Sequence, residues 1–129
     1  MDEKRNTLTE AEWQVMEELW ESAPRTGREL TEALSARVGW SRSTTLTLLR
    51  RLEEKGAVRS ADGGGKKTFS PLLRREDAAL RETEDLLSRV YKGSVSMLLS
   101  SLTKKQRLPK EEIEELYAIL REMEEKDDA

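Results

Sequence analysis

Residues 40–70 read WSRSTTLTLLRRLEEKGAVRSADGGGKKTFS, and the pattern of these residues predicts the fold class. Ser41 is a residue type that caps the start of a helix, and Gly56 suits the left-handed position that follows one, so a helix is expected to run to Lys55. Placed at 3.6 residues per turn, its leucines gather on one side. These inward residues are Leu48, Leu49 and Leu52, with Thr45 among them and Leu46 at the edge. The outward arc starts with small hydroxyl residues and continues into paired arginines; it comprises Ser43, Thr44, Thr47, Arg50, Arg51 and Glu54.

The second half of the stretch has the pattern of a β-hairpin. Short extended runs at 58–61 and 66–70 flank Asp62-Gly63-Gly64-Gly65, and a glycine-rich turn between two such runs is typical of a hairpin. Three glycines in a row also occur in loops that hold nucleotide phosphates. That alternative is disfavoured, because no helix opens after Gly65 and no lysine-serine pair follows at the required spacing.

Two helices are expected upstream. Thr9 with Glu12, and Thr26 with Glu29, each have the spacing of a capping box, so helices are predicted at about 9–21 and 27–38. Three residues then separate the second helix from the third, and so short a connection between helices indicates a helix-turn-helix. The hairpin behind it is the wing. Residues 7–72 are therefore predicted to form a winged helix-turn-helix domain.

The first helix has an apolar side and an acidic side. Trp13 and Trp20 widen the apolar side; they either pack in the core or line a ligand pocket, and packing is the favoured interpretation. The opposite arc is expected to face solvent and comprises Glu10, Gln14, Glu17, Glu18 and Glu21.

Residues 73–126 are predicted to form a helical dimerisation domain. Apolar residues recur at steps of three and four from about residue 76 to 105, with Gly93 marking a bend or break, and Pro109 suits the first position of a last helix. These stripes must dock on the N-terminal domain or on a second copy of the chain, and a two-fold dimer is the favoured alternative. The residues expected at that interface are Leu87, Val90, Tyr91, Met97, Leu98, Ile113, Leu116 and Leu120. The fold class is thus mostly α with a small β-wing.

Charge is distributed unevenly along a chain whose net charge is −3. Residues 24–67 hold ten Lys/Arg and five Asp/Glu, whereas residues 108–129 hold three Lys/Arg and nine Asp/Glu. The chain contains no Cys and no His, which argues against a disulfide framework, a common metal site and an enzyme that uses either residue. No metal and no cofactor are expected. No apolar run has the length of a membrane helix, and no secretory leader is recognisable, so a cytoplasmic protein without membrane insertion is predicted.

The basic residues of the central region match the needs of DNA contact. Short hydroxyl side chains at the start of a recognition helix allow close approach to base edges in the major groove, and arginines farther along reach phosphates. Lys66 and Lys67 in the wing would add contacts to the backbone, with Arg59 on the facing strand. The alternative for each cation alone is a solvated surface charge. The predicted DNA-binding residues are Arg42, Ser43, Thr44, Thr47, Arg50, Arg51, Lys66 and Lys67. A rival function is a winged helix that binds a protein partner.

Four segments of the chain resemble the penicillinase-repressor family of bacterial winged-helix repressors, the BlaI/MecI/CopY type. The segments are LTEAEW at 8–13 with Val15-Met16, WS at 40–41 leading into 44–52 and Lys55-Gly56, VYKG at 90–93, and EEIEEL at 111–116. The match spans about residues 7 to 121. The first and third segments are fairly specific, because winged helices in general do not share them.

This resemblance implies a homodimeric transcriptional repressor that binds an operator dyad in double-stranded DNA. It also implies a dimer made by the C-terminal helices. In antibiotic-responsive members, a membrane sensor with a zinc protease domain leads to repressor cleavage at an Asn-Phe bond. The matching positions here are Ser101 and Leu102, which depart from that pattern. Those members also carry a basic pair at the positions of Ser43 and Leu46, so their operator sequence is not carried over. Copper-responsive members carry C-terminal Cys pairs, which this chain lacks.

Overall fold

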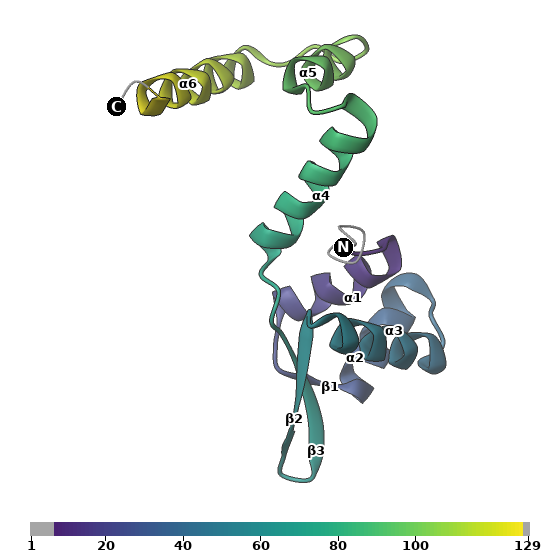
Figure 1. Ribbon diagram of the computed structural model, residues 1–129. Helices are drawn as coiled ribbons and strands as arrows, with labels where there is room; N and C mark the ends of the chain where they lie inside the picture. Colours follow the sequence, from purple (N-terminus) through teal and green to yellow (C-terminus); the bar gives the residue numbers. More distant parts are fainter. Residues whose placement is uncertain (1–6, 128–129) are drawn as a thin grey trace. The chain divides into compact units, whose positions relative to one another are not determined.

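The computed structural model describes residues 7–127, and its first part is built on three helices (Figure 1). They are α1 (Glu10–Glu21), α2 (Gly27–Val38) and α3 (Arg42–Lys55). Both expected capping boxes are present: the Thr9 and Thr26 hydroxyls accept from the backbone N–H of Glu12 and Glu29, whose carboxylates accept from the cap residues in return. Gly56 ends α3 with a φ of 80°. The sequence prediction of these three helices is confirmed.

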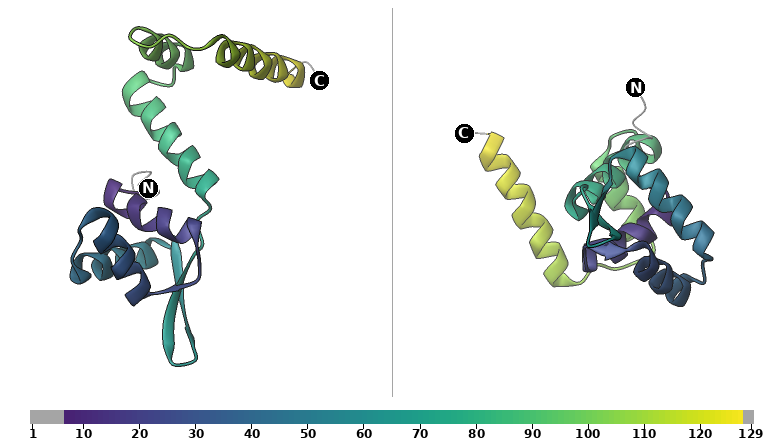
Figure 2. Two further views of the ribbon diagram at one scale, coloured as in Figure 1. Left: turned by 180° about the vertical axis from the view of Figure 1, so that it is seen from behind. Right: turned by 90° about the horizontal axis from the view of Figure 1, so that it is seen from below.

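A three-stranded antiparallel sheet carries the wing. Its strands are β1 (Arg25–Thr26), β2 (Val58–Gly63) and β3 (Lys66–Pro71), in the order β1-β3-β2. Figure 2 shows the β2–β3 hairpin projecting beyond the three helices. The hairpin was expected, but it is longer than predicted, because Asp62 pairs with Lys67 and Gly63 with Lys66. Only Gly64 and Gly65 remain in the turn, with φ of 59° and 81°, which is the backbone that a tight hairpin turn requires. The short strand β1 was not expected.

The core lies where α1, α2 and α3 meet the base of the sheet. The inward arc of α3 is as expected, since Thr45, Leu48, Leu49 and Leu52 are buried. The other buried apolar residues are Leu8, Val15, Met16, Leu19, Leu30, Leu34, Ala57, Val58, Phe69 and Ala78. Trp13 and Trp20 pack partly buried against this cluster, so packing was the correct expectation for both.

The remaining helices are α4 (Arg75–Tyr91), α5 (Val95–Thr103) and α6 (Lys110–Asp127). The break at Gly93 is confirmed: Lys92 and Gly93 have φ of 52° and 87°. Pro109 precedes α6 instead of opening it, and its carbonyl accepts from Glu112 and Ile113. By packing, the chain divides into two units, one ending at Leu86 and the other starting at Leu87. None of the residues 87–127 in the second unit is buried.

Candidate nucleic-acid interface

The outer face of α3 is polar and open to solvent. Arg42, Ser43, Thr44, Arg50 and Arg51 are exposed, and Thr47 is half-buried. The same helix buries its leucines, so the core fixes which side of α3 points outward. All six predicted residues on this helix are thus presented on its free side.

Hydroxyl groups cluster at the first turn of α3. Ser41 caps the helix by accepting from the Thr44 backbone N–H at 3.3 Å, and its Oγ lies 3.1 Å from Ser43 Oγ and 3.0 Å from Thr44 Oγ1. No acidic residue lies in this first turn. The unpaired backbone N–H groups of a helix start carry partial positive charge, so this end of α3 is suited to a phosphate.

A groove of about 350 Å³ joins α3 to the wing. It brings Arg50 of α3 together with Lys67 of β3, and the Lys67 ammonium lies 5.5 Å from the centre of the Phe69 ring. Leu46 and Phe69 line its apolar part. Sequence reasoning placed Leu46 at the edge of the apolar arc and left it out of the site, although it is 38 % exposed. Lys66 is exposed on the wing but does not line the groove.

Two polar contacts hold α3 in place beyond its leucines. The Lys55 ammonium donates to Glu12 Oε1 at 2.6 Å and to the Thr7 carbonyl at 3.2 Å, which ties the end of α3 to the start of α1. Ser60 Oγ donates to Glu53 Oε2 at 2.6 Å, which ties α3 to β2. Because Glu12 is buried and is also the capping-box carboxylate, one side chain serves both helices.

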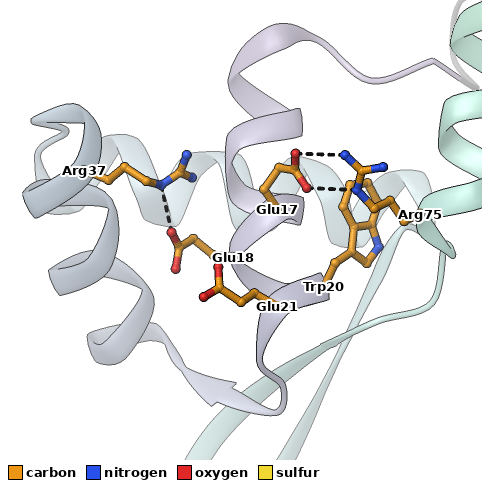
Figure 3. A pocket seen from close by; sticks show the side chains of 6 residues that line it. All are labelled: Glu17, Glu18, Trp20, Glu21, Arg37 and Arg75. Carbon is orange, nitrogen blue, oxygen red and sulfur yellow. Dashed lines mark hydrogen bonds and ion pairs between the residues drawn. The ribbon is translucent and has the colours of Figure 1, made fainter. Parts of the chain in front are cut away.

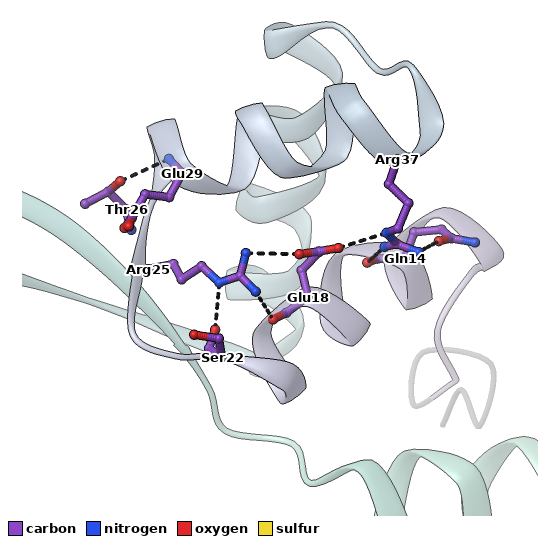
Figure 4. Close-up of polar contacts among 7 residues, drawn as sticks. All are labelled: Gln14, Glu18, Ser22, Arg25, Thr26, Glu29 and Arg37. Carbon is purple, nitrogen blue, oxygen red and sulfur yellow. Dashed lines mark hydrogen bonds and ion pairs between the residues drawn. The ribbon is translucent and has the colours of Figure 1, made fainter.

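A second ionic network joins α1, β1 and α2 (Figure 4). Arg25 donates to Glu18 Oε1 at 3.0 Å and to the Glu18 and Ser22 carbonyls, while Arg37 donates to Glu18 Oε2 at 2.8 Å and to Gln14. The expectation that Glu18 faces solvent was wrong, since its side chain is 12 % exposed. Helical spacing could not reveal this burial, because both arginines come from other elements.

A hollow of about 420 Å³ in the first unit is lined in part by this network (Figure 3). Two arginines and three carboxylates line it together with Trp20: Arg37, Arg75, Glu17, Glu18 and Glu21. Arg75 bonds both oxygens of Glu17, at 3.2 and 3.3 Å, and Arg37 bonds Glu18. The hydrogen bond from Arg75 is the main reason that the pKa of Glu17 is lowered. Both arginines are therefore engaged within the chain.

The second unit presents the residues expected at a dimer interface. Val90, Met97, Ile113 and Leu120 are between 41 % and 55 % exposed, and Leu87, Tyr91, Leu98 and Leu116 are half-buried. Other large apolar side chains of the same helices are also exposed, among them Val95, Leu102, Tyr117, Ile119 and Met123. Within residues 87–127, no side chain forms a buried core.

Ser101 and Leu102 lie together on α5, and both are exposed. Among residues 7–127, no three acidic side chains come together in the manner of a metal site. None of the helices in that part of the chain is both long enough and apolar enough to cross a membrane.

Comparison with known proteins gives consistent matches. A model of the family described as "Penicillinase repressor" matches residues 8–122. The methicillin resistance regulatory protein MecI of Staphylococcus aureus (strain N315) is 29 % identical over 120 residues, which cover 93 % of this chain and 98 % of that protein. The penicillinase repressor of Bacillus licheniformis is 30 % identical over 115 residues, 89 % of this chain and 90 % of that protein. The solution structure of the DNA-binding domain of the repressor BlaI has a TM-score of 0.50 and 30 % identity, and the match covers 54 % of this chain and 85 % of that one.

Proposed function

The chain belongs to the penicillinase-repressor family of transcriptional repressors, and on this premise we propose that it binds a palindromic operator in double-stranded DNA as a homodimer. In this proposal, residues 7–72 contact the DNA and residues 73–126 make the dimer. The recognition residues are those predicted on α3 and the wing.

One observation carries the DNA contact. The groove that joins Arg50 of α3 to Lys67 of the wing puts two cations at the edge of an exposed, hydroxyl-rich helix face. A helix that enters the major groove needs short side chains at its start and cations that reach the phosphates beside it. The residues at 42–51 and 66–67 supply both in one domain.

The dimer is supported by the second unit. Its apolar side chains are left half-buried or exposed within one chain, and burying such surface is what stabilises association. A two-fold dimer presents two copies of α3, so its binding site must itself be palindromic, with half-sites about one helical turn or a multiple of it apart.

Selection from a pool of random duplex DNA, followed by a salt titration of the recovered sequence, tests this function. We expect a palindrome and a steep loss of affinity with salt, since each phosphate contact contributes a slope of about −0.9. Arg50→Ala and Lys67→Ala should weaken binding to all sequences and each flatten the slope by about 1. Thr44→Ala and Thr47→Ala should instead relax the preference for particular bases.

Recovery of no sequence, together with a monomer in solution, would contradict both parts of the proposal and favour a winged helix that binds a protein partner. Equal binding of random duplex by the parent, Arg50→Ala and Lys67→Ala proteins would contradict the contact assignment alone.

Release by a membrane sensor protease pathway is proposed on the family resemblance. Ser101 and Leu102 are exposed on α5, which supports access to that bond, although it is not an Asn-Phe bond. Mass spectrometry of the repressor from cells treated with a β-lactam should then detect a fragment that ends at Ser101. An intact chain in cells in which the target gene is derepressed would contradict this route.

A further inference from the structure

The segment between the wing and α4 is fastened to the first unit at both of its ends. At its start, the backbone N–H groups of Leu72 and Leu73 both donate to the carbonyl of Ala57, at 2.8 and 3.1 Å. Ala57 directly follows Gly56, the residue that ends α3. The indole N–H of Trp20 donates to the Leu73 carbonyl at 2.9 Å. The entry to α4 is thus tied to the end of the proposed recognition helix.

Arg75, the first residue of α4, makes the next contact (Figure 3). Its guanidinium bonds both oxygens of Glu17, and its central carbon lies 5.9 Å from the ring centres of both Trp13 and Trp20. The two rings meet edge to face at 5.2 Å, and the Trp13 N–H donates to Glu17 Oε2 at 3.3 Å. One guanidinium therefore satisfies a carboxylate and covers two aromatic rings, all on α1.

The neighbouring arginine differs in every one of these respects. Arg74 pairs with Glu76, two residues along, and both side chains are more than 70 % exposed. One turn farther along α4, Ala78 is buried, whereas Leu80 is 56 % exposed. The first turn of α4 is thus held against α1, whereas Leu80 on the same helix is exposed to solvent.

We propose that Arg75 is a positioning residue that clamps the first turn of α4 onto α1, and so sets the half-site spacing that the dimer accepts. This inference rests on the proposed function. α4 is one unbroken helix of 17 residues, about 25 Å long, that begins in the first unit and ends in the second. Because an α-helix of this length is stiff, contacts that hold its first turn also fix the direction of the rest of the helix. If that direction is already fixed in the free protein, less conformational entropy is lost when both copies of α3 bind the two halves of one dyad.

A pair of spin labels tests the clamp without DNA. The chain has no Cys, so Ala36→Cys on α2 and Glu84→Cys on α4 supply the two labelling sites, both exposed. Labelled chain is diluted into unlabelled chain, and the distance distribution is measured by pulsed electron spin resonance. We expect a narrow distribution in the parent, a broad one in Arg75→Gln and a narrow one in Arg74→Gln. Equal widths in the parent and Arg75→Gln would overturn the proposal.

Binding to the selected operator tests the spacing. Arg75→Gln and Arg74→Gln remove the same charge at adjacent positions, so general attraction to DNA is lowered equally. We expect both variants to bind a single half-site alike, and Arg75→Gln to bind the full dyad about fivefold more weakly than Arg74→Gln, since the lost clamp acts on joint engagement alone. Arg75→Gln should also discriminate less among dyads whose half-sites are moved apart by one or two base pairs.

The possible results separate this inference from the proposed function. If the parent selects no duplex, the function and the spacing role both fail, while the label distances still show whether the clamp exists. If the parent selects a dyad but Arg75→Gln loses the same factor on half-site and dyad, the function stands and the positioning role is overturned.

Discussion

Thr45 points a hydroxyl group into the core of the first unit. Its side chain is fully buried on the inward arc of α3, and within residues 7–127 its Oγ1 is a buried side-chain atom without a hydrogen-bond partner. Leaving such a group unpaired costs free energy, because it has lost its bonds to water and gained none in return. Its neighbours on the exposed arc, Ser43 and Thr44, bond Ser41 instead.

Thr45→Val should therefore raise the free energy of unfolding by about 1 kcal/mol, since valine keeps the shape and removes the unpaired hydroxyl. Urea denaturation measures this change. Thr31→Val is the matched control, because the Thr31 hydroxyl donates to the Gly27 carbonyl at 2.7 Å and its loss should not stabilise the protein. A less stable Thr45→Val protein would mean that the hydroxyl has a partner.

Glu17 provides a second test at a single residue. The hydrogen bond from Arg75 is the largest of the effects on its carboxyl group, followed among the lowering effects by the Trp13 N–H and the charges of Arg75 and Arg37, and together they hold its pKa below the ordinary value of 4.5. A lowered pKa means that the contact stabilises the fold fully above that ordinary value and is lost as the pH falls through the lowered one. In Arg75→Gln, the pKa of Glu17 should rise towards its ordinary value.

Nuclear magnetic resonance of the Glu17 carboxyl carbon and the Trp13 indole N–H measures this pKa directly. The midpoint should be the same for both signals, because they belong to one hydrogen bond. Arg74→Gln should leave the midpoint in place. A midpoint unmoved by Arg75→Gln would show that the two side chains do not meet in solution.

Among the elements, α1 acts as the centre of the winged unit. Each of its ends holds a different partner: Glu12 holds α3 through Lys55, and Glu18 holds β1 and α2 through Arg25 and Arg37. The Glu18 carboxylate is nearly enclosed, so its contacts with those two arginines offset the cost of removing a charged group from water. Helix packing in this unit is thus reinforced by charge pairs that lie partly out of water.

Glu18→Ala should lower the free energy of unfolding by about 2 to 3 kcal/mol, because it leaves Arg25 and Arg37 without their shared carboxylate. Glu32→Ala is the control. It breaks a pair with Arg28 of which both members are more than two thirds exposed, and it should cost no more than about 0.5 kcal/mol. Thermal unfolding of both variants measures the difference. Equal losses would mean that burial of Glu18 contributes nothing.

At the scale of the whole molecule, the two units differ in what stabilises them. Among residues 7–86 of the first unit, thirteen apolar side chains are buried, whereas none is buried between residues 87 and 127 of the second unit. A unit without a core of its own needs apolar surface from elsewhere to remain folded, and a second copy of the chain supplies it in the proposed dimer.

Leu120→Glu should weaken the dimer by about a hundredfold, because a charge replaces an apolar side chain at a predicted contact in both subunits. Ala118→Glu is the matched control. It adds the same charge on the same helix, but two residues away and so about 200° around the helix axis, on the acidic side. Sedimentation equilibrium measures both. Equal dissociation constants would contradict the predicted face of α6.

Features that depend on neighbouring residues were predictable from the sequence. The two capping boxes, the glycine end of α3, the break at Gly93 and the inward arc of α3 were all expected, and all are present. Each rests on contacts within one or two helical turns, where residue type and spacing determine the conformation. The same reasoning placed the proposed DNA-contact residues of α3 on its solvent-facing side, because the leucines occupy the side that packs in the core.

Contacts between residues that are far apart in the sequence could not be predicted and are known only from the folded structure. The Glu18–Arg37 pair spans 19 residues of chain and the Arg75–Glu17 contact spans 58, so no local spacing indicates either one. The strand β1 forms because β3 returns beside it, although two residues alone have no strand pattern. The physical reason is the same in all three cases. Ion pairs and backbone hydrogen bonds depend on distance in space, not on separation in sequence, so they form with whichever partner the packing of the chain brings near.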